Sequence, residues 1–353
     1  MINDNSNYVE AELNATPQAG LPINISNQFL TGGAQGASSN SNFSSGFSAS
    51  LSKDYNVLLP AISQDASEDI SLGASFSGDF VTDGSSNYTI ASVLAAQKSH
   101  LLLRGQVKNR KEAQGMAGVR KSTKAAAYAE AVALASELVQ VAIQDCRVLD
   151  VFGELRWKQP HVTAALAAGI RLGTEVGEPL THKFVNVNNI GHDIDMAGDF
   201  SEDGDFDPNT DYDDAIDNGI LFLENASGGW RWVVDNTTYG ADQSFVWNRG
   251  SVIEAAQYVA KTMRETAELV FVGQKVSNGA ASSIKSVLRN KLIELWRANI
   301  ITSSDDAPQG FVEDTFVVVV SGNTAEVQVE IKPVQGLDFV FITFTLGDIR
   351  QSA

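Results

Sequence analysis

Near its C-terminus the chain carries the apolar run Phe339-Val340-Phe341-Ile342-Thr343-Phe344-Thr345-Leu346. The run is rich in aromatic and β-branched residues and holds no charge, which predicts a strand. Little sequence follows it, so the strand must pair inside a sheet or with another molecule, because a bare apolar edge invites association. The run therefore predicts a C-terminal region that takes part in assembly.

The residues around this run predict a C-terminal α+β domain over residues 241–353. The middle strand, Glu326–Ile331, alternates polar and apolar residues, which indicates one face in water. A hairpin turn is expected at Ser321–Asn323. The expected elements are helices from Val252 to Val270 and from Ile284 to Trp296, then strands at Phe316–Val320, Glu326–Ile331 and Asp338–Leu346.

Residues 29–240 predict a second domain, of α/β type, with Gly/Ser-rich and acidic loops. Residues 1–28 are polar and rich in Asn, and we expect them to form an arm or loop. The order of elements gives a mixed, α+β fold class for the whole chain. The expected elements are a strand at Tyr55–Pro60, helices from Ile90 to about Gly115 (bent near Gly105) and from Ser122 to Val139, a strand from Val139 to Val151, and a helix from Pro160 to Gly169.

The composition narrows the function classes. The chain has 353 residues and a net charge of −18, from 43 acidic and 25 basic residues, which argues against a general nucleic-acid binder. Its single cysteine, Cys146, excludes an intramolecular disulfide and is expected in a buried strand. No run reaches the roughly 18 apolar residues that a membrane span needs, so we expect none.

Positive charge is concentrated between Lys98 and Lys124, where eight basic residues meet one acidic residue, Glu112. One interpretation is a surface that meets an acidic surface on another subunit; the other is a solvated helix face. The basic residues are Lys98, Arg104, Lys108, Arg110, Lys111, Arg120, Lys121 and Lys124.

Negative charge is concentrated between His192 and Asp217, which hold eleven carboxylates and no Lys or Arg. The spacing of Asp203, Asp205 and Asp207 resembles a calcium loop, but Pro208 occupies the position where such a loop has Gly. A solvated loop is the favoured interpretation. A weak cation site and a contact for a basic neighbour remain alternatives.

No catalytic pattern emerges from the sequence. The four histidines, His100, His161, His182 and His192, match no metal-ligand spacing, and no glycine-rich loop ends in Gly-Lys-Ser/Thr. We therefore expect no enzyme, no cofactor, no metal and no catalytic residues. Trp230 and Trp232 are interpreted as core or interface anchors.

Three stretches together resemble the tail sheath protein family of contractile injection systems, typified by myovirus tail sheaths. Each motif alone is weak, but their order and spacing are fairly specific. They are the glycine motif Leu30–Gly36 leading to the strand with Pro60; the Asn109–Glu112 segment with the following Ala-rich helix and Pro160–Gly169; and the C-terminal Ile284–Arg289, Leu295–Ala298, Lys332–Val334 and Phe339–Leu346. Family members usually carry a longer N-terminal region, so this is either a minimal sheath or part of a longer protein.

The resemblance implies a structural subunit of a contractile phage tail sheath. Copies would stack as hexameric rings around a tail tube, with baseplate and tail terminator proteins as partners and without nucleic acid. Contraction would drive the tube through the host envelope. The location would be the virion, after assembly in the host cytoplasm. Alternatives are the sheath of a phage-like bacteriocin or secretion system and, in another class, a carboxylate-dependent hydrolase.

Assembly by strand addition suits such a subunit, because a tether of backbone hydrogen bonds survives sliding between neighbours. The expected host is the sheet Phe316–Leu346, and the expected donors are residues 1–28 or the tail after Gly347. Opposite charges on the basic and acidic segments are expected to form contacts that differ between two packings. The residues expected at subunit contacts are Lys108, Arg110, Lys111, Phe339, Phe341 and Phe344.

Overall fold

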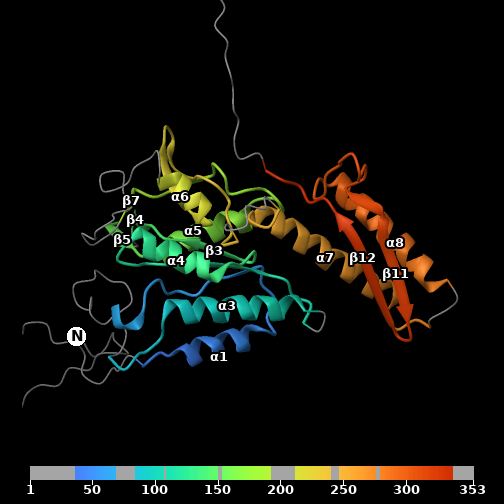
Figure 1. Cartoon of the computed structure of the whole chain (residues 1–353), viewed down its shortest axis with the longest axis horizontal. Coiled ribbons are helices and arrows are strands. Elements are labelled where there is room, and N and C mark those ends of the chain that lie inside the picture. The colour runs from blue at the N-terminus through green and yellow to red at the C-terminus, as the bar shows by residue number, and fades with distance from the viewer. Residues whose placement is uncertain are drawn as a thin grey trace, which may run out of the picture. The chain divides into compact units, whose positions relative to one another are not determined.

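The computed structural model contains helices and strands in both the N-terminal and the C-terminal parts of the chain (Figure 1). The expected mixed α+β class is therefore confirmed. The expected domain boundaries stay a prediction. The structure describes residues 36–68, 84–106, 109–149, 153–191, 211–239, 246–275 and 279–336.

A four-stranded parallel sheet is the centre of the α/β body, by which we mean the described residues from 36 to 239. Strands β2 and β3 are buried along their whole length, as expected for parallel strands that helices cover on both faces. In spatial order the strands are β1 (Val57–Leu58), β2 (Gln114–Gly118), β3 (Val139–Ala142) and β8 (Ile220–Leu221).

Helices cover the two faces of this sheet. Ala117 and Val141 point to one face and join a core cluster with α1, α3 and α4. Met116 and Ala142 point to the other face and join a second cluster with α5. The bounds are α1 (Asn40–Ser50), α3 (Ile90–Gly105), α4 (Lys124–Leu134) and α5 (Pro160–Gly173).

Local sequence explains where several of these helices begin. The Thr89 hydroxyl accepts a hydrogen bond from the backbone N–H of Ser92 at the start of α3. Thr123 does the same for Ala126 in α4. Pro160 occupies the first turn of α5, which confirms the helix expected there.

Two expected helices are shorter than their sequences suggested. Helix α3 ends at Gly105 instead of about Gly115, and strand β2 (Gln114–Gly118) begins where the expected helix was to end. The sheet needs a strand of small residues here, because a Cβ at Gly118 would collide with the backbone of His161 at the start of α5. Helix α4 runs from Lys124 to Leu134, since Ala135 adopts a left-handed conformation that ends it.

The single strand expected from Val139 to Val151 is divided in two. Strand β3 belongs to the parallel sheet, whereas β4 (Asp145–Leu149) pairs antiparallel with β5 (Leu155–Lys158) and β7 (Asn189–Gly191). Gln144 lies between β3 and β4, where the chain passes from one sheet to the other. Its side-chain amide donates to the carbonyl of Leu223 and accepts from the N–H of the same residue, which fixes this connection. The strand expected at Tyr55–Pro60 is reduced to the two residues of β1.

A second three-stranded sheet and a short helix complete the α/β body. Trp232 in this sheet and Cys146 in β4 are buried in the second core cluster, so their interpretation as core residues is confirmed. The sheet contains β6 (Phe184–Val185), β10 (Gly229–Trp232) and β9 (Leu223–Ala226), and the helix is α6 (Asp211–Asp217).

Two long helices and a hairpin follow. The helices are α7 (Gly250–Phe271) and α8 (Ala280–Arg297), and the hairpin joins β11 (Phe311–Ser321) to β12 (Thr324–Ile331). The expected turn is confirmed, with Gly322 at a φ of 61° between the paired Ser321 and Thr324. We call α8, the hairpin and the second half of α7 the C-terminal unit, because their side chains share a third core cluster. The third strand expected there, Asp338–Leu346, lies outside the described residues.

Candidate subunit interface

The β11–β12 hairpin has one covered face and one open face. Phe316 is buried against α8, with Val318 and Val320 packed beside it. On the opposite face Val317 and Val319 are 48% and 52% exposed. Within the described residues this sheet has two strands, so each has an edge that can pair with another strand.

The end of β12 continues into a short pairing with the segment that follows α8. The backbone N–H of Thr302 donates to the carbonyl of Lys332 at 2.8 Å, and that of Val334 donates to Ile300 at 3.1 Å. Successive strand residues point their backbone groups to opposite sides. The N–H and C=O of Ile301 therefore face away from β12, and this residue is itself buried.

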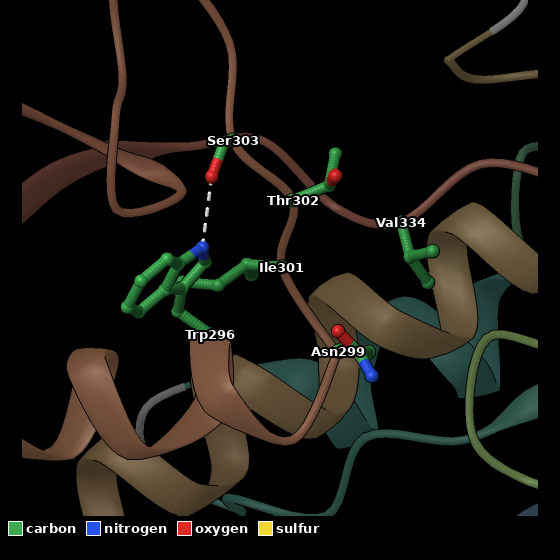
Figure 2. Close-up of a pocket in the computed structure, with 6 residues that line it drawn as sticks. All are labelled: Trp296, Asn299, Ile301, Thr302, Ser303 and Val334. Atoms are coloured by element: carbon green, nitrogen blue, oxygen red, sulfur yellow. Dashed lines mark hydrogen bonds between the residues drawn. The ribbon is translucent and has the colours of Figure 1, made fainter.

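A pocket of about 330 Å³ lies beside this segment (Figure 2). The indole N–H of Trp296 donates to the hydroxyl of Ser303 at 2.9 Å, which fixes the aromatic wall. Asn299, at a left-handed φ of 58°, directs the chain out of α8. The six lining residues include no acid and no histidine; they are Trp296, Asn299, Ile301, Thr302, Ser303 and Val334. An apolar side chain with neighbouring backbone groups fits this lining better than a hydrolytic reaction does.

Ion pairs surround the hairpin. Lys332 contacts Asp306 at 2.9 Å and Glu330 at 2.7 Å. The hydrogen bond to Glu330 is the main reason that the pKa of Lys332 is raised, and a bond from Ser304 is the main reason that the pKa of Asp306 is lowered. Such exposed pairs set the charge at this end of the hairpin but contribute little to its rigidity.

Part of the basic segment Lys98–Lys124 is internal. Arg104 is buried, donates to the carbonyls of Lys53 and Tyr55, and lies 3.6 Å from the centroid of the Tyr55 ring. Arg120 is buried in an ion pair with Asp145 at 2.9 Å. The idea of one continuous surface formed by all eight cations is therefore wrong for these two, because each is desolvated and held inside the fold.

The six residues expected at subunit contacts are described only in part. Arg110 pairs with Glu268 of α7 and is 48% exposed. Lys111 donates to the carbonyl of Ser52. Lys108 and the three aromatic residues Phe339, Phe341 and Phe344 lie outside the described residues, as does the glycine motif before Gly36. Their role in subunit contacts stays a prediction.

The acidic segment is described from residue 211 onward, where Asp213, Asp214 and Asp217 are exposed on α6. In the described part of the chain, no three residues of the types His, Cys, Asp and Glu lie close enough to hold a metal ion. Among the helices described here, none combines the length and the apolar character needed to cross a membrane.

The pocket was not predicted from the sequence. Trp296 was assigned to an apolar helix stripe, and the other five lining residues carry no pattern that would mark them. They come from the end of α8, the segment after it and the segment after β12, so only the fold brings them together (Figure 2).

Sequence comparison identifies relatives among phage proteins, although no family model matches the chain. The tail sheath protein of Bacillus phage SP01 is 29% identical over 160 residues, which are 45% of this chain and 26% of that protein. That of Staphylococcus phage Twort is 24% identical over 195 residues, 54% of this chain and 30% of its own length. The chain thus spans less than a third of these relatives.

Solved structures share the fold. The sheath tail protein of Desulfitobacterium hafniense matches with a TM-score of 0.53 at 14% identity, over 80% of this chain and 54% of that one. A chain of the anti-feeding prophage baseplate matches with a TM-score of 0.52 at 11% identity, over 94% of this chain and 99% of that one. The expected likeness to the tail sheath family is therefore confirmed.

Proposed function

We propose that this chain, a relative of phage tail sheath proteins, is a structural subunit of a contractile phage tail sheath. The observation that carries the proposal is the sequence similarity to the sheath proteins of two phages, which reaches about half of this chain. Copies stack as hexameric rings around the tail tube, between the baseplate and the tail terminator. The subunit belongs to the virion and is assembled in the host cytoplasm.

The C-terminal unit supports this proposal, because it offers sites for strand addition. The open edges of β11 and β12 can each pair with an extended segment. Net backbone hydrogen bonds are worth about 1 kcal/mol each, so several in series form a strong but deformable link. The donors are residues 1–28 or the tail after Gly347 of a neighbouring copy, with Phe339, Phe341 and Phe344 as apolar anchors.

Charged residues give the second kind of subunit contact. Arg110, Lys111 and Lys108 form one contact surface, and the acidic segment His192–Asp217 of a neighbour is its partner. Exposed charges suit contacts that must change, because water and salt replace a lost partner at little energetic expense. The subunit then has two packings, and contraction releases energy stored during assembly, without a nucleotide.

A non-viral particle is the second candidate, because the baseplate chain of the anti-feeding prophage matches nearly the whole of this chain. The subunit would then form the sheath of a bacteriocin-like or secretion particle. Imaging of the native particle separates the two: a DNA-filled head above the sheath supports the phage, and its absence supports the second candidate.

The test of assembly is negative-stain microscopy of the purified full chain and of a variant lacking residues 337–353. The full chain is expected to form rings or striated tubes, and the shortened chain to lose them, since the run Asp338–Leu346, expected from the sequence to be a strand, is removed. Circular dichroism checks that the shortened chain keeps its helices. A full chain that remains a small uniform oligomer at all concentrations contradicts the proposal.

A further inference from the structure

One face of helix α7 is joined to the α/β body by three ion pairs. Their residues on α7 are spaced three and four apart, so they lie on a single stripe of the helix. The charges on the stripe are positive, positive and negative, and those on the body are the reverse. The pairs are Lys261 with Asp54 at 3.8 Å, Arg264 with Glu112, and Glu268 with Arg110. We call these three pairs the charge ladder.

The second half of α7 uses its apolar side for a different purpose. Val259 and Met263 are buried in the core cluster of the C-terminal unit, and Ala267 and Phe271 pack against that cluster. The apolar stripe therefore holds α8 and the hairpin. The polar stripe contacts the α/β body through the charge ladder. One turn before the ladder, the amide of Gln257 donates to the carbonyl of Ala113 at 3.3 Å.

The body's side of the ladder is held in place by contacts that do not involve α7. The loop that carries Asp54 is fixed by the buried Arg104, which donates to Lys53 and Tyr55. Lys111 holds the same loop at Ser52. Arg110 itself sits at a left-handed φ of 57°, and its N–H donates to the carbonyl of Gln106 at 2.9 Å. This part of the basic segment thus forms a preorganised surface for α7.

The middle pair of the ladder is largely enclosed, since Arg264 is 25% and Glu112 10% exposed, whereas the two outer pairs are open to water. The Arg110 and Glu268 side chains are 48% and 36% exposed, and Asp54 is 72% exposed. Pairs of this kind weaken when salt screens them. The first turn of α7 is held differently: the buried Asp235 accepts the backbone N–H of Ser251 at 2.8 Å, and the side chain of Gln114 donates to Gly250 at 2.7 Å.

We infer that the charge ladder is a salt-sensitive latch. It sets the direction of α7, and with it the C-terminal unit, relative to the α/β body. The buried contacts at Gly250 and Ser251 are the pivot about which the helix moves when the latch opens. The latch is a property of the single chain and does not rest on the proposed assembly. An acidic neighbour that competes for Arg110 opens it.

The test measures a distance across the latch by electron spin resonance. Nitroxide labels are placed at the exposed Ser122→Cys in the body and Asn323→Cys in the hairpin turn, with the buried Cys146 replaced by Ala. The labelled full chain is diluted with unlabelled chain, so that distances between copies do not contribute. One distance is expected at low salt, and a second population at about 1 M salt, where the Debye length falls to about 3 Å.

Charge variants distinguish the latch from simple packing. Glu268→Arg at low salt is expected to raise the ratio of the second distance population to the first about fivefold. A change of this size corresponds to the loss of one of the stronger exposed ion pairs. The control Asp314→Arg makes the same charge change at an exposed position of β11, outside the charge ladder, and leaves the ratio unchanged. The exchange Arg110→Glu with Glu268→Arg restores the first distance.

Two outcomes overturn the inference. In the first, neither salt nor Glu268→Arg changes the distance distribution, which means that packing alone directs α7. In the second, Glu268→Arg changes it but the charge exchange does not restore it, which means that the variant disturbs the helix and not a pair. Thermal unfolding of each variant confirms that it is folded. Because dilution with unlabelled chain restricts the measurement to distances within one copy, its result can be interpreted whether or not the chain forms tubes.

Discussion

The two halves of helix α7 are attached to the α/β body by opposite kinds of polar contact. At the first turn, the backbone N–H of Ser251 donates to Asp235, which is buried in an ion pair with Arg171. Further along, the two outer pairs of the charge ladder join side chains that water reaches. A buried network has no substitute partner, whereas an exposed pair can exchange with water and ions. One helix can therefore be fixed at its start and adjustable further along.

The buried end is a connected network. Asp235 accepts hydrogen bonds from Ser251 and, at 2.8 Å, from the side chain of Gln140, besides its pair with Arg171. Arg171 also lies 3.5 Å from Glu254, a residue of α7. Removing one partner of a buried pair leaves the other charge desolvated, which typically destabilises a protein by about 3–5 kcal/mol.

The largest expected effect comes from Asp235→Ala. We expect the free energy of unfolding to fall by about 3–5 kcal/mol, because Arg171 keeps its buried charge and loses its nearest counter-ion. The matched variant at the ladder, Glu268→Ala, is expected to lower it by at most about 1 kcal/mol. Urea unfolding of the two variants gives both values. Equal losses would show that the two ends of α7 do not differ in the way described.

A smaller effect is expected from Gly250→Ala at the pivot. A Cβ there would lie 2.6 Å from the amide nitrogen of Gln140 and 2.8 Å from the guanidinium of Arg171. Crowding of this kind costs about 1–3 kcal/mol, which the better helix propensity of Ala offsets by up to about 1 kcal/mol. A net loss of about 1–2 kcal/mol in urea unfolding is therefore expected.

Gly169→Ala is the control for that prediction. Gly169 lies inside α5, and a Cβ there would have no atom within 4 Å. The variant is expected to gain up to about 1 kcal/mol from helix propensity alone. If both glycine variants were stabilised, the pivot would have more room than the structure indicates.

Regular periodicity made several elements predictable. The apolar stripes of α7 and α8, the Pro160 start of α5 and the turn between β11 and β12 follow from local spacing. Strand β2 was missed, because Gln114–Gly118 has no β-branched residue and two glycines. Its conformation is decided by neighbours: Gly118 fits against α5, which no local pattern reveals.

The sequence shows which segments are charged, but not which of their side chains are buried and which are exposed. Arg104 and Arg110 belong to the same basic segment, yet one is buried on Tyr55 and the other is half exposed beside α7. The partner of Arg110, Glu268, is 158 residues away in the chain. Ion pairs at such separation depend on the fold, so the charge ladder and the pocket at Trp296 could not be predicted.

The smallest expected effect is a pH dependence at Glu254, where the buried and the exposed ends of α7 meet. Burial raises the pKa of this carboxyl above its ordinary value of 4.5, although Arg171 opposes the shift. Between pH 4.5 and the raised pKa, the folded chain binds this proton more firmly than the unfolded chain. Stability from this group is therefore lost as the pH rises through that window.

Glu254→Gln removes this dependence, since an amide does not titrate. The unfolding free energy of the variant minus that of the wild type is expected to increase as the pH rises above 4.5, and to be constant below it. Glu265→Gln makes the same change at an exposed position of the same helix and is the matched control. A flat difference for Glu254→Gln would mean that water reaches this carboxyl, and that the fixed end of α7 stops before it.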